Sequence, residues 1–123
     1  MNKLIKLFIT SISAITLALV SFSSSFAKVE GEYIVLGAAV SLTGKYSSNG
    51  VHTQNGYNLA VERINKMGGV EVGGKKYKFE IIYYDDESNS GRAAQLAERL
   101  IKQDGVKYML GPYSSGLTKA MAP

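Results

Sequence analysis

Along the chain, segments with a strand-like pattern of hydrophobic and polar residues alternate with segments that have a helix-like pattern. Residues 33–40 form a continuous apolar run with β-branched side chains, which is typical of a strand buried on both faces of a parallel sheet. Residues 77–84 alternate apolar and polar before turning apolar on both faces, and residues 106–110 form a short third run. These patterns predict three strands.

A helix is predicted between the first two strands. Its apolar residues recur at three- and four-residue steps, at positions 51, 57, 60, 61, 64 and 67. We expect Ser48 or Asn49 to cap its start and Gly68-Gly69 to end it. Residues 70–76, with Gly73-Gly74 at the centre, then predict a tight turn or small hairpin.

Two further helices follow the second and third strands. Asn89 or Ser90 is expected to cap the first of them, and Gly105 to end it. The last begins near Ser114 or Ser115. The expected buried stripe of the middle helix is Ala93, Ala94, Ala97, Leu100 and Ile101.

The resulting order, β-α-β-α-β-α, predicts an α/β fold. Right-handed crossovers place the three parallel strands in the spatial order second–first–third, which is half of a doubly wound sheet. The third strand would leave an unpaired apolar edge. We therefore expect residues 28–123 to be the truncated start of a larger domain, and to be aggregation-prone or partly folded alone.

The first 27 residues are typical of a secretory signal peptide. Lys3 and Lys6 precede an apolar run over residues 7–20, and residues 21–27 are small and polar up to Ser25-Phe26-Ala27. The apolar run is shorter than the roughly 20 residues that span a bilayer. We expect cleavage after Ala27 and export of residues 28–123.

Charge and cysteine content exclude several partners. Residues 28–123 contain 12 Lys and Arg against 10 Asp and Glu, which is too balanced to predict binding to nucleic acid or an anionic membrane. The chain has no cysteine, so it forms no disulfides or thiolate metal sites and carries no lipid-modified cysteine. We expect the exported protein to be free in its compartment.

A ligand crevice is predicted where the strand order reverses, beyond the carboxyl ends of the first and third strands. The loops there, residues 41–50 and 111–116, are rich in Ser and Gly, and each contains a tyrosine. Neither loop has a His, a Cys or a carboxylate. This composition favours binding of a small polar solute without chemistry.

Four residues of these loops are candidates for ligand contact. Ser114 and Ser115 stand at a helix start, where free backbone N–H groups favour a carboxylate, although either serine is equally suited to cap the helix. Tyr46 and Tyr113 would flank the apolar part of a ligand. Packing at the sheet edge is the alternative for both tyrosines.

The remaining groups of polar residues do not predict a metal, catalytic or phosphate-binding site. Residues 85–87 are consecutive acids that lack the ligand spacing of a calcium loop, so we expect a solvated turn or charges at the entry of a helix. His52 is the single histidine, and no Gly-x-Ser-x-Gly motif accompanies it. The paired glycines lack the Lys-Ser/Thr of a phosphate loop. We therefore predict no catalytic activity, no cofactor and no metal.

The ordered motifs resemble those of the branched-chain amino-acid-binding (Leu/Ile/Val) type of ABC-importer receptor. The likeness covers residues 33–123, in the segments 37–44, 55–65, 68–70, 74–75, 84–86 and 111–116. It implies a type I periplasmic binding protein, with two Rossmann-like lobes that close on a solute and about three times this length. Only the start of the first lobe is present.

The resemblance also implies roles for individual residues. Ser115, with Ser114 beside it, matches the serine that meets the α-carboxylate of the ligand, and loop 43–50 matches a wall of the pocket. Many members carry an aromatic residue where this chain has Asn49, so Tyr46 is expected to take over that wall. The carboxylate that binds the ligand's ammonium group belongs to the second lobe.

At the level of the whole protein, the resemblance implies a periplasmic, monomeric receptor that delivers an amino acid to a membrane permease. Three alternatives stay open. The same fold serves as a ligand-sensing ectodomain, and related receptors carry amides, urea or small carboxylates. A Rossmann-like half could also belong to a secreted enzyme such as a hydrolase, which would need a His or an acid in the loops after the strands.

Overall fold

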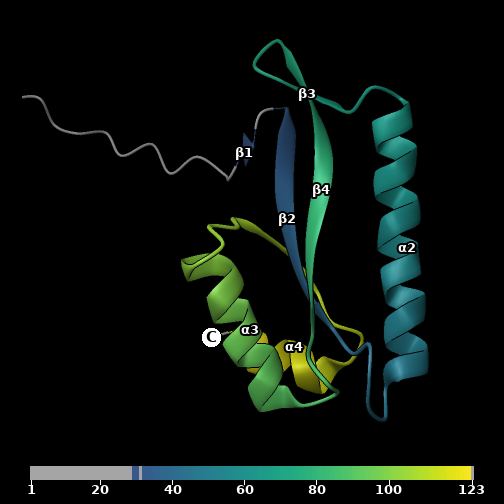
Figure 1. Ribbon diagram of the computed structural model, residues 1–123, viewed down its shortest axis with the longest axis vertical. Helices are drawn as coiled ribbons and strands as arrows, with labels where there is room; N and C mark the ends of the chain where they lie inside the picture. The colour runs from purple at the N-terminus through teal and green to yellow at the C-terminus, as the bar shows by residue number, and fades with distance from the viewer. Residues whose placement is uncertain (1–28, 31, 123) are drawn as a thin grey trace, which may run out of the picture.

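The computed structural model describes residues 29, 30 and 32–122, so the predicted signal peptide lies outside the described residues. Strands and helices alternate along most of the chain (Figure 1). Their bounds are β1 (Val29–Glu30), β2 (Tyr33–Val40), α2 (Ser47–Lys66), β3 (Val70–Val72), β4 (Lys75–Asp85), α3 (Ser90–Lys102), β5 (Tyr108–Leu110) and α4 (Ser115–Met121).

The three predicted strands are parallel and lie in the predicted order. β2 is central, pairing with β4 from Tyr33↔Lys78 to Val40↔Asp85. On its other side it pairs with β5 from Leu36↔Tyr108 to Ala38↔Leu110. The second–first–third order is therefore confirmed for these strands.

The sheet is nevertheless mixed, and the prediction of parallel strands alone was incomplete. β1 pairs antiparallel with β2, and β3 pairs antiparallel with β4, which gives five strands. The β3–β4 hairpin is the one predicted for residues 70–76. Its turn is made by Gly73 and Gly74, both at positive φ, whereas the two residues of β1 are too few to produce a periodic pattern.

Helices cover both faces of the sheet. α2 lies on one face, and α3 and α4 lie together on the other (Figure 1). The core on the α3 side is built by Val35, Leu100 and Val106. Gly37 permits this packing, because a Cβ there would lie 2.9 Å from Met109 Sδ.

The predicted helix faces needed correction. α3 buries Leu96 together with Ala93, Ala97 and Leu100, whereas Ile101 is 50% exposed. On α2, Val51 and Met67 belong to the apolar spacing that predicted the helix, but they are 41% and 66% exposed. At about 100° per residue, they lie on opposite flanks of the face that carries Gly50, Tyr57 and Ile64.

The predicted cap of α2 was also wrong. The N-cap is Tyr46, without a capping side chain, and Ser48 and Asn49 lie within the first turn. The helix begins earlier than predicted: the Ser47 amide donates to the Gly44 carbonyl at 3.1 Å and the Gly50 amide to the Tyr46 carbonyl at 2.8 Å, so Ser48 and Asn49 are already helical. The end of α2 is as predicted, with Gly68 and Gly69 at positive φ.

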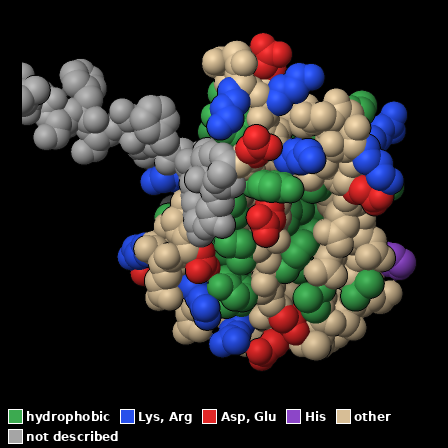
Figure 2. All heavy atoms as spheres, turned by 45° about the horizontal axis from the view of Figure 1, so that its top comes forward, with side chains coloured by type: hydrophobic (Ala, Val, Ile, Leu, Met, Phe, Trp, Pro, Cys, Tyr) green, Lys and Arg blue, Asp and Glu red, His purple; other side chains and the backbone are tan. Residues whose placement is uncertain are grey.

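Charges of both signs are interspersed on the face of the molecule shown in Figure 2. In the part of the chain that the structure describes, no helix has the length and hydrophobicity needed to cross a membrane.

Candidate functional site

The loops that follow β2, β4 and β5 meet at the carboxyl end of the sheet, at the bottom of Figure 1. Tyr46 and Tyr113 come from the first and last of these loops. Their ring centroids are 5.9 Å apart and the ring planes are tilted by 54°. The two predicted ligand loops are therefore in direct contact.

A small polar hollow of about 180 Å³ lies beside this tyrosine pair. It includes Tyr46 and Ser114 among the predicted site residues. The full lining is Lys45, Tyr46, Ser88, Ser90, Ser114, Gly116 and Leu117. Side-chain hydroxyls from three loops thus face one cavity.

The two candidate serines have different environments. Ser114 Oγ accepts from the Leu117 amide at 3.2 Å, so Ser114 caps α4. Ser115 is the first residue of α4 and is exposed. The capping alternative is confirmed for Ser114, whereas its neighbour Ser115 is exposed and does not line the hollow.

The other predicted residues lie around the hollow, not in its lining. Tyr113 is 47% exposed. Asn49 is exposed in the first turn of α2. Both lie at the carboxyl end of the sheet, beside the loops that form the hollow.

Sequence reasoning missed Lys45, Ser88 and Ser90. The Lys45 ammonium lies 4.6 Å from the centroid of the Tyr46 ring, close enough for a cation–π contact. A signal was available for the serines, because they follow the second strand, whose carboxyl end reaches the same edge of the sheet. A cation beside serine hydroxyls favours an anionic group.

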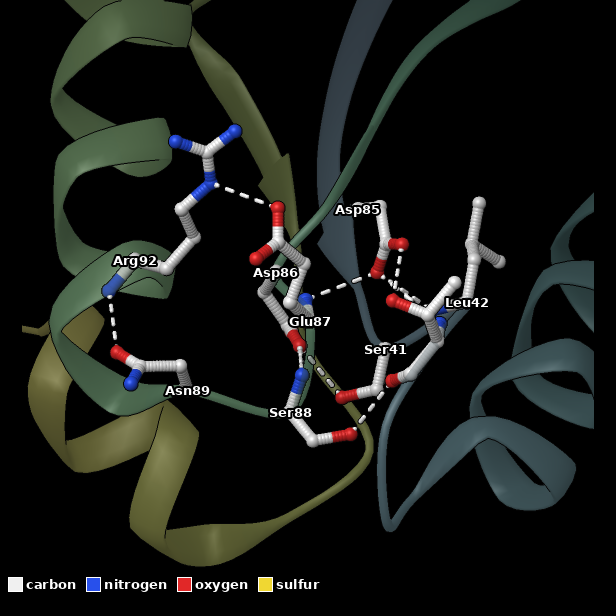
Figure 3. A network of polar contacts seen from close by, with 9 residues as sticks. Ser41, Leu42, Asp85, Asp86, Glu87, Ser88, Asn89 and Arg92 are labelled. Atoms are coloured by element: carbon white, nitrogen blue, oxygen red, sulfur yellow. Dashed lines mark hydrogen bonds and ion pairs between the residues drawn. The ribbon is translucent and has the colours of Figure 1, made fainter.

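The acidic turn after β4 fixes the backbone of the first ligand loop (Figure 3). Asp85 Oδ1 accepts from the amides of Leu42 and Thr43 at 2.9 and 3.2 Å. Asp85 Oδ2 accepts from Thr43 Oγ1 at 2.7 Å. One carboxylate therefore holds two consecutive residues of loop 41–46.

Asp86 is buried, which corrects the prediction of a solvated turn. Its Oδ1 accepts from Ser41 Oγ at 2.6 Å and from the Ser88 amide at 2.8 Å. Ser88 Oγ then donates to the Thr43 carbonyl at 2.7 Å and accepts from the Tyr46 amide. The loop is thus held in place before any ligand arrives, which lowers the ordering cost of binding.

The hydrogen bonds of Asp85 also set its ionisation. Burial pushes the pKa of this carboxyl upward, but hydrogen bonds from the Thr43 hydroxyl and from the Glu87, Thr43 and Leu42 amides outweigh burial. The net pKa lies below the ordinary value, so the carboxylate is charged at neutral pH.

The site can hold a solute by hydroxyl, amide and ammonium donors. His52 is exposed on α2. Among residues 29, 30 and 32–122, no group of three His, Cys, Asp or Glu is placed to hold a metal ion. The carboxylates nearest the site, Asp85 and Asp86, accept hydrogen bonds from the loop that follows β2.

Known proteins are similar to this chain in sequence and in fold. A family model described as periplasmic binding protein matches residues 33–123. The Leu/Ile/Val-binding protein BraC3 of Rhizobium johnstonii is 31% identical over 107 residues, covering 87% of this chain and 28% of that relative.

Two solved structures are also similar. The branched-chain amino acid transporter substrate-binding protein LivJ from Streptococcus pneumoniae, in complex with isoleucine, has a TM-score of 0.63 and 32% identity, over 71% of this chain and 24% of that one. A solute-binding protein of an ABC transporter from Rhodopseudomonas palustris, in complex with 3,4-dihydroxybenzoic acid, has a TM-score of 0.60 and 31% identity, over 75% and 24% of the chains.

The chain therefore spans about a quarter of the length of these relatives. The family model accounts for residues 33–123, which include the whole α/β unit from β2 to α4. On this match the chain belongs to the periplasmic binding protein family.

Proposed function

We propose that the full-length protein is an extracytoplasmic receptor that binds an amino acid or similar small carboxylate and delivers it to the permease of an ABC importer. The observation that carries this proposal is the convergence of the Tyr46 and Tyr113 loops beside Ser114 and Ser115. Family membership supports an extracytoplasmic location, and cleavage after Ala27 is part of the proposal.

A carboxylate is the favoured ligand group on two grounds. Isoleucine and 3,4-dihydroxybenzoic acid, bound by the two similar proteins, differ in shape but both carry a carboxyl group. In this chain, Lys45 and the Ser114 hydroxyl, which accepts from the Leu117 amide and keeps its proton, supply matching donors. The tyrosine pair then serves as a wall for the remainder of the solute, and the importer permease is the partner.

Ser115→Ala in the full-length protein is expected to weaken binding of a carboxylate solute by about 1–3 kcal/mol, or roughly 5- to 150-fold. The hydroxyl is exposed at the start of α4 and free to donate. A thermal-shift screen against amino acids, small amides and aromatic acids identifies the solute, because a true ligand raises the melting midpoint by mass action. Titration calorimetry then measures the affinity.

Ser114→Ala is the matched control. It removes the α4 cap, so we expect a stability loss of about 1 kcal/mol and a smaller change in affinity. Unchanged affinity in Ser115→Ala would remove Ser115 from the site. Conversion of the bound solute into a product would overturn the receptor assignment.

A further inference from the structure

The loop that presents Ser115 is held weakly by the sheet. β5 is three residues long, and its ladder with β2 ends at Ala38↔Leu110. Gly111 is therefore the first residue beyond the strand pairing. Residues 111–114 then connect directly to α4, which has seven residues. Packing of α4 on α3, with Leu117 buried, fixes the far end of this segment, so residues 111–114 are the part that needs an anchor of its own.

Tyr57 supplies that anchor from the other face of the sheet. It lies on the face of α2 that carries Gly50 and Ile64, and its hydroxyl donates to the Gly111 carbonyl at 2.8 Å. Burial raises the pKa of Tyr57 above its ordinary value, so the hydroxyl remains a donor at neutral pH. A tyrosine side chain has only two torsions to fix, so it orders the loop at low entropic cost.

We propose that Tyr57 is a positioning residue of the ligand site, whose hydrogen bond to the Gly111 carbonyl fixes the loop that presents Ser115. This inference rests on the proposed function. It extends the site to the middle of α2, a helix whose first turn carries Asn49. Through this hydrogen bond, a movement of α2 would also move the loop that presents Ser115.

Tyr83 offers a matched control. Its hydroxyl, on β4, donates to Asn58 Oδ1 on α2 at 2.8 Å, so it joins the same helix to the sheet without touching a ligand loop. Burial raises the pKa of this tyrosine as well. Tyr57→Phe and Tyr83→Phe each remove one hydroxyl of similar burial and bond length.

The first test needs no ligand. Hydrogen exchange is measured on the ligand-free full-length protein and on both phenylalanine variants. Faster exchange over residues 111–115 in Tyr57→Phe, but not in Tyr83→Phe, is expected. Equal exchange of this segment in all three proteins would overturn the proposal.

The second test is a double-mutant cycle with Ser115→Ala, using isoleucine and 3,4-dihydroxybenzoate as probes of affinity. Tyr57→Phe is expected to raise the Kd of the probe that binds by about 3- to 10-fold. In the Ser115→Ala background, the same substitution should change the binding free energy by less than half as much. Tyr83→Phe is expected to leave affinity within about twofold.

The outcomes of the cycle separate the two proposals. If Ser115→Ala weakens binding and Tyr57→Phe does not, or if their effects are fully additive, the positioning role is wrong while the proposed function stands. If Ser115→Ala has no effect, the carboxylate contact fails, and the exchange result alone decides whether Tyr57 holds the loop.

Discussion

Gly50→Ala is expected to lower the free energy of unfolding of the full-length protein by about 3 kcal/mol or more, as measured by denaturant unfolding. Gly50 is buried where α2 crosses the end of β2, and an added Cβ would lie 1.8 Å from the Ser41 carbonyl oxygen. The Gly50 amide is held by the Tyr46 carbonyl at 2.8 Å. Both sides of the clash are backbone, so relief requires a shift of the helix or the loop.

Gly56→Ala is the control for this prediction, because Gly56 lies in the same helix with no atom within 4 Å of the Cβ it would gain. It is expected to stabilise the protein by about 0.5–1 kcal/mol through helix propensity. Equal stability of Gly50→Ala and the unmodified protein would show that α2 does not need this close approach. Because Ser41 begins the ligand loop, weaker binding is expected to accompany the lost stability in Gly50→Ala.

The elements of the fold were predictable because their signals are local. The apolar run over residues 33–40 coincides with β2, and glycines at positive φ follow α2 where they were expected. Asn89 caps α3, accepting from the Arg92 amide at 2.9 Å, as its position before the helix predicted. The order of the parallel strands followed from the handedness of the crossovers.

The supports of the site were not predictable, because their partners are distant in sequence. Asp86 meets Ser41 across 45 residues, and Ser88 meets Tyr46 across 42. No periodicity encodes such pairs, so consecutive acids gave the appearance of a solvated turn. The same limit applies at the start of α2, where the Tyr46 amide donates to Ser88 Oγ from another loop.

Tertiary constraints also explain which serine is free to bind. Ser114 and Ser115 are equivalent as sequence, since both are serines two or three residues before the apolar Leu117. The chain bends so that Ser114 has extended backbone and its Oγ accepts from Leu117, which commits it to the cap. Its neighbour Ser115 is exposed and does not cap α4, which is compatible with the proposal that Ser115 contacts the carboxylate of the ligand.

The second large effect is expected at the acidic turn. Asp85→Asn should lower the free energy of unfolding at pH 7 by about 2–3 kcal/mol, because one carboxylate accepts from the amides of Leu42, Thr43 and Glu87 and from the Thr43 hydroxyl. A neutral amide accepts through one oxygen only and presents donors to the other positions. Ligand affinity should fall as well, since loop 41–46 loses its main anchor.

The effect of Asp85→Asn has a defined pH dependence. The pKa of Asp85 is lowered in the folded protein, so the carboxylate contributes stability above its unfolded pKa of about 3.9. That contribution is lost as the pH falls from there through the folded pKa. The difference in unfolding free energy between the unmodified protein and Asp85→Asn should therefore be constant near neutrality and shrink in this acidic window.

Glu87→Gln separates the role of Asp85 from general charge in the same turn. The Glu87 carboxylate is exposed and forms only a 3.5 Å ion pair with Arg92, so its loss should change stability little at any pH in the series. If Asp85→Asn and Glu87→Gln gave the same small, pH-independent change, the carboxylate of Asp85 would not be what holds the ligand loop. If only Asp85→Asn shows a pH-dependent loss of stability, the ionised carboxylate of Asp85, which joins the ends of β2 and β4, is the group that holds the ligand loop in place.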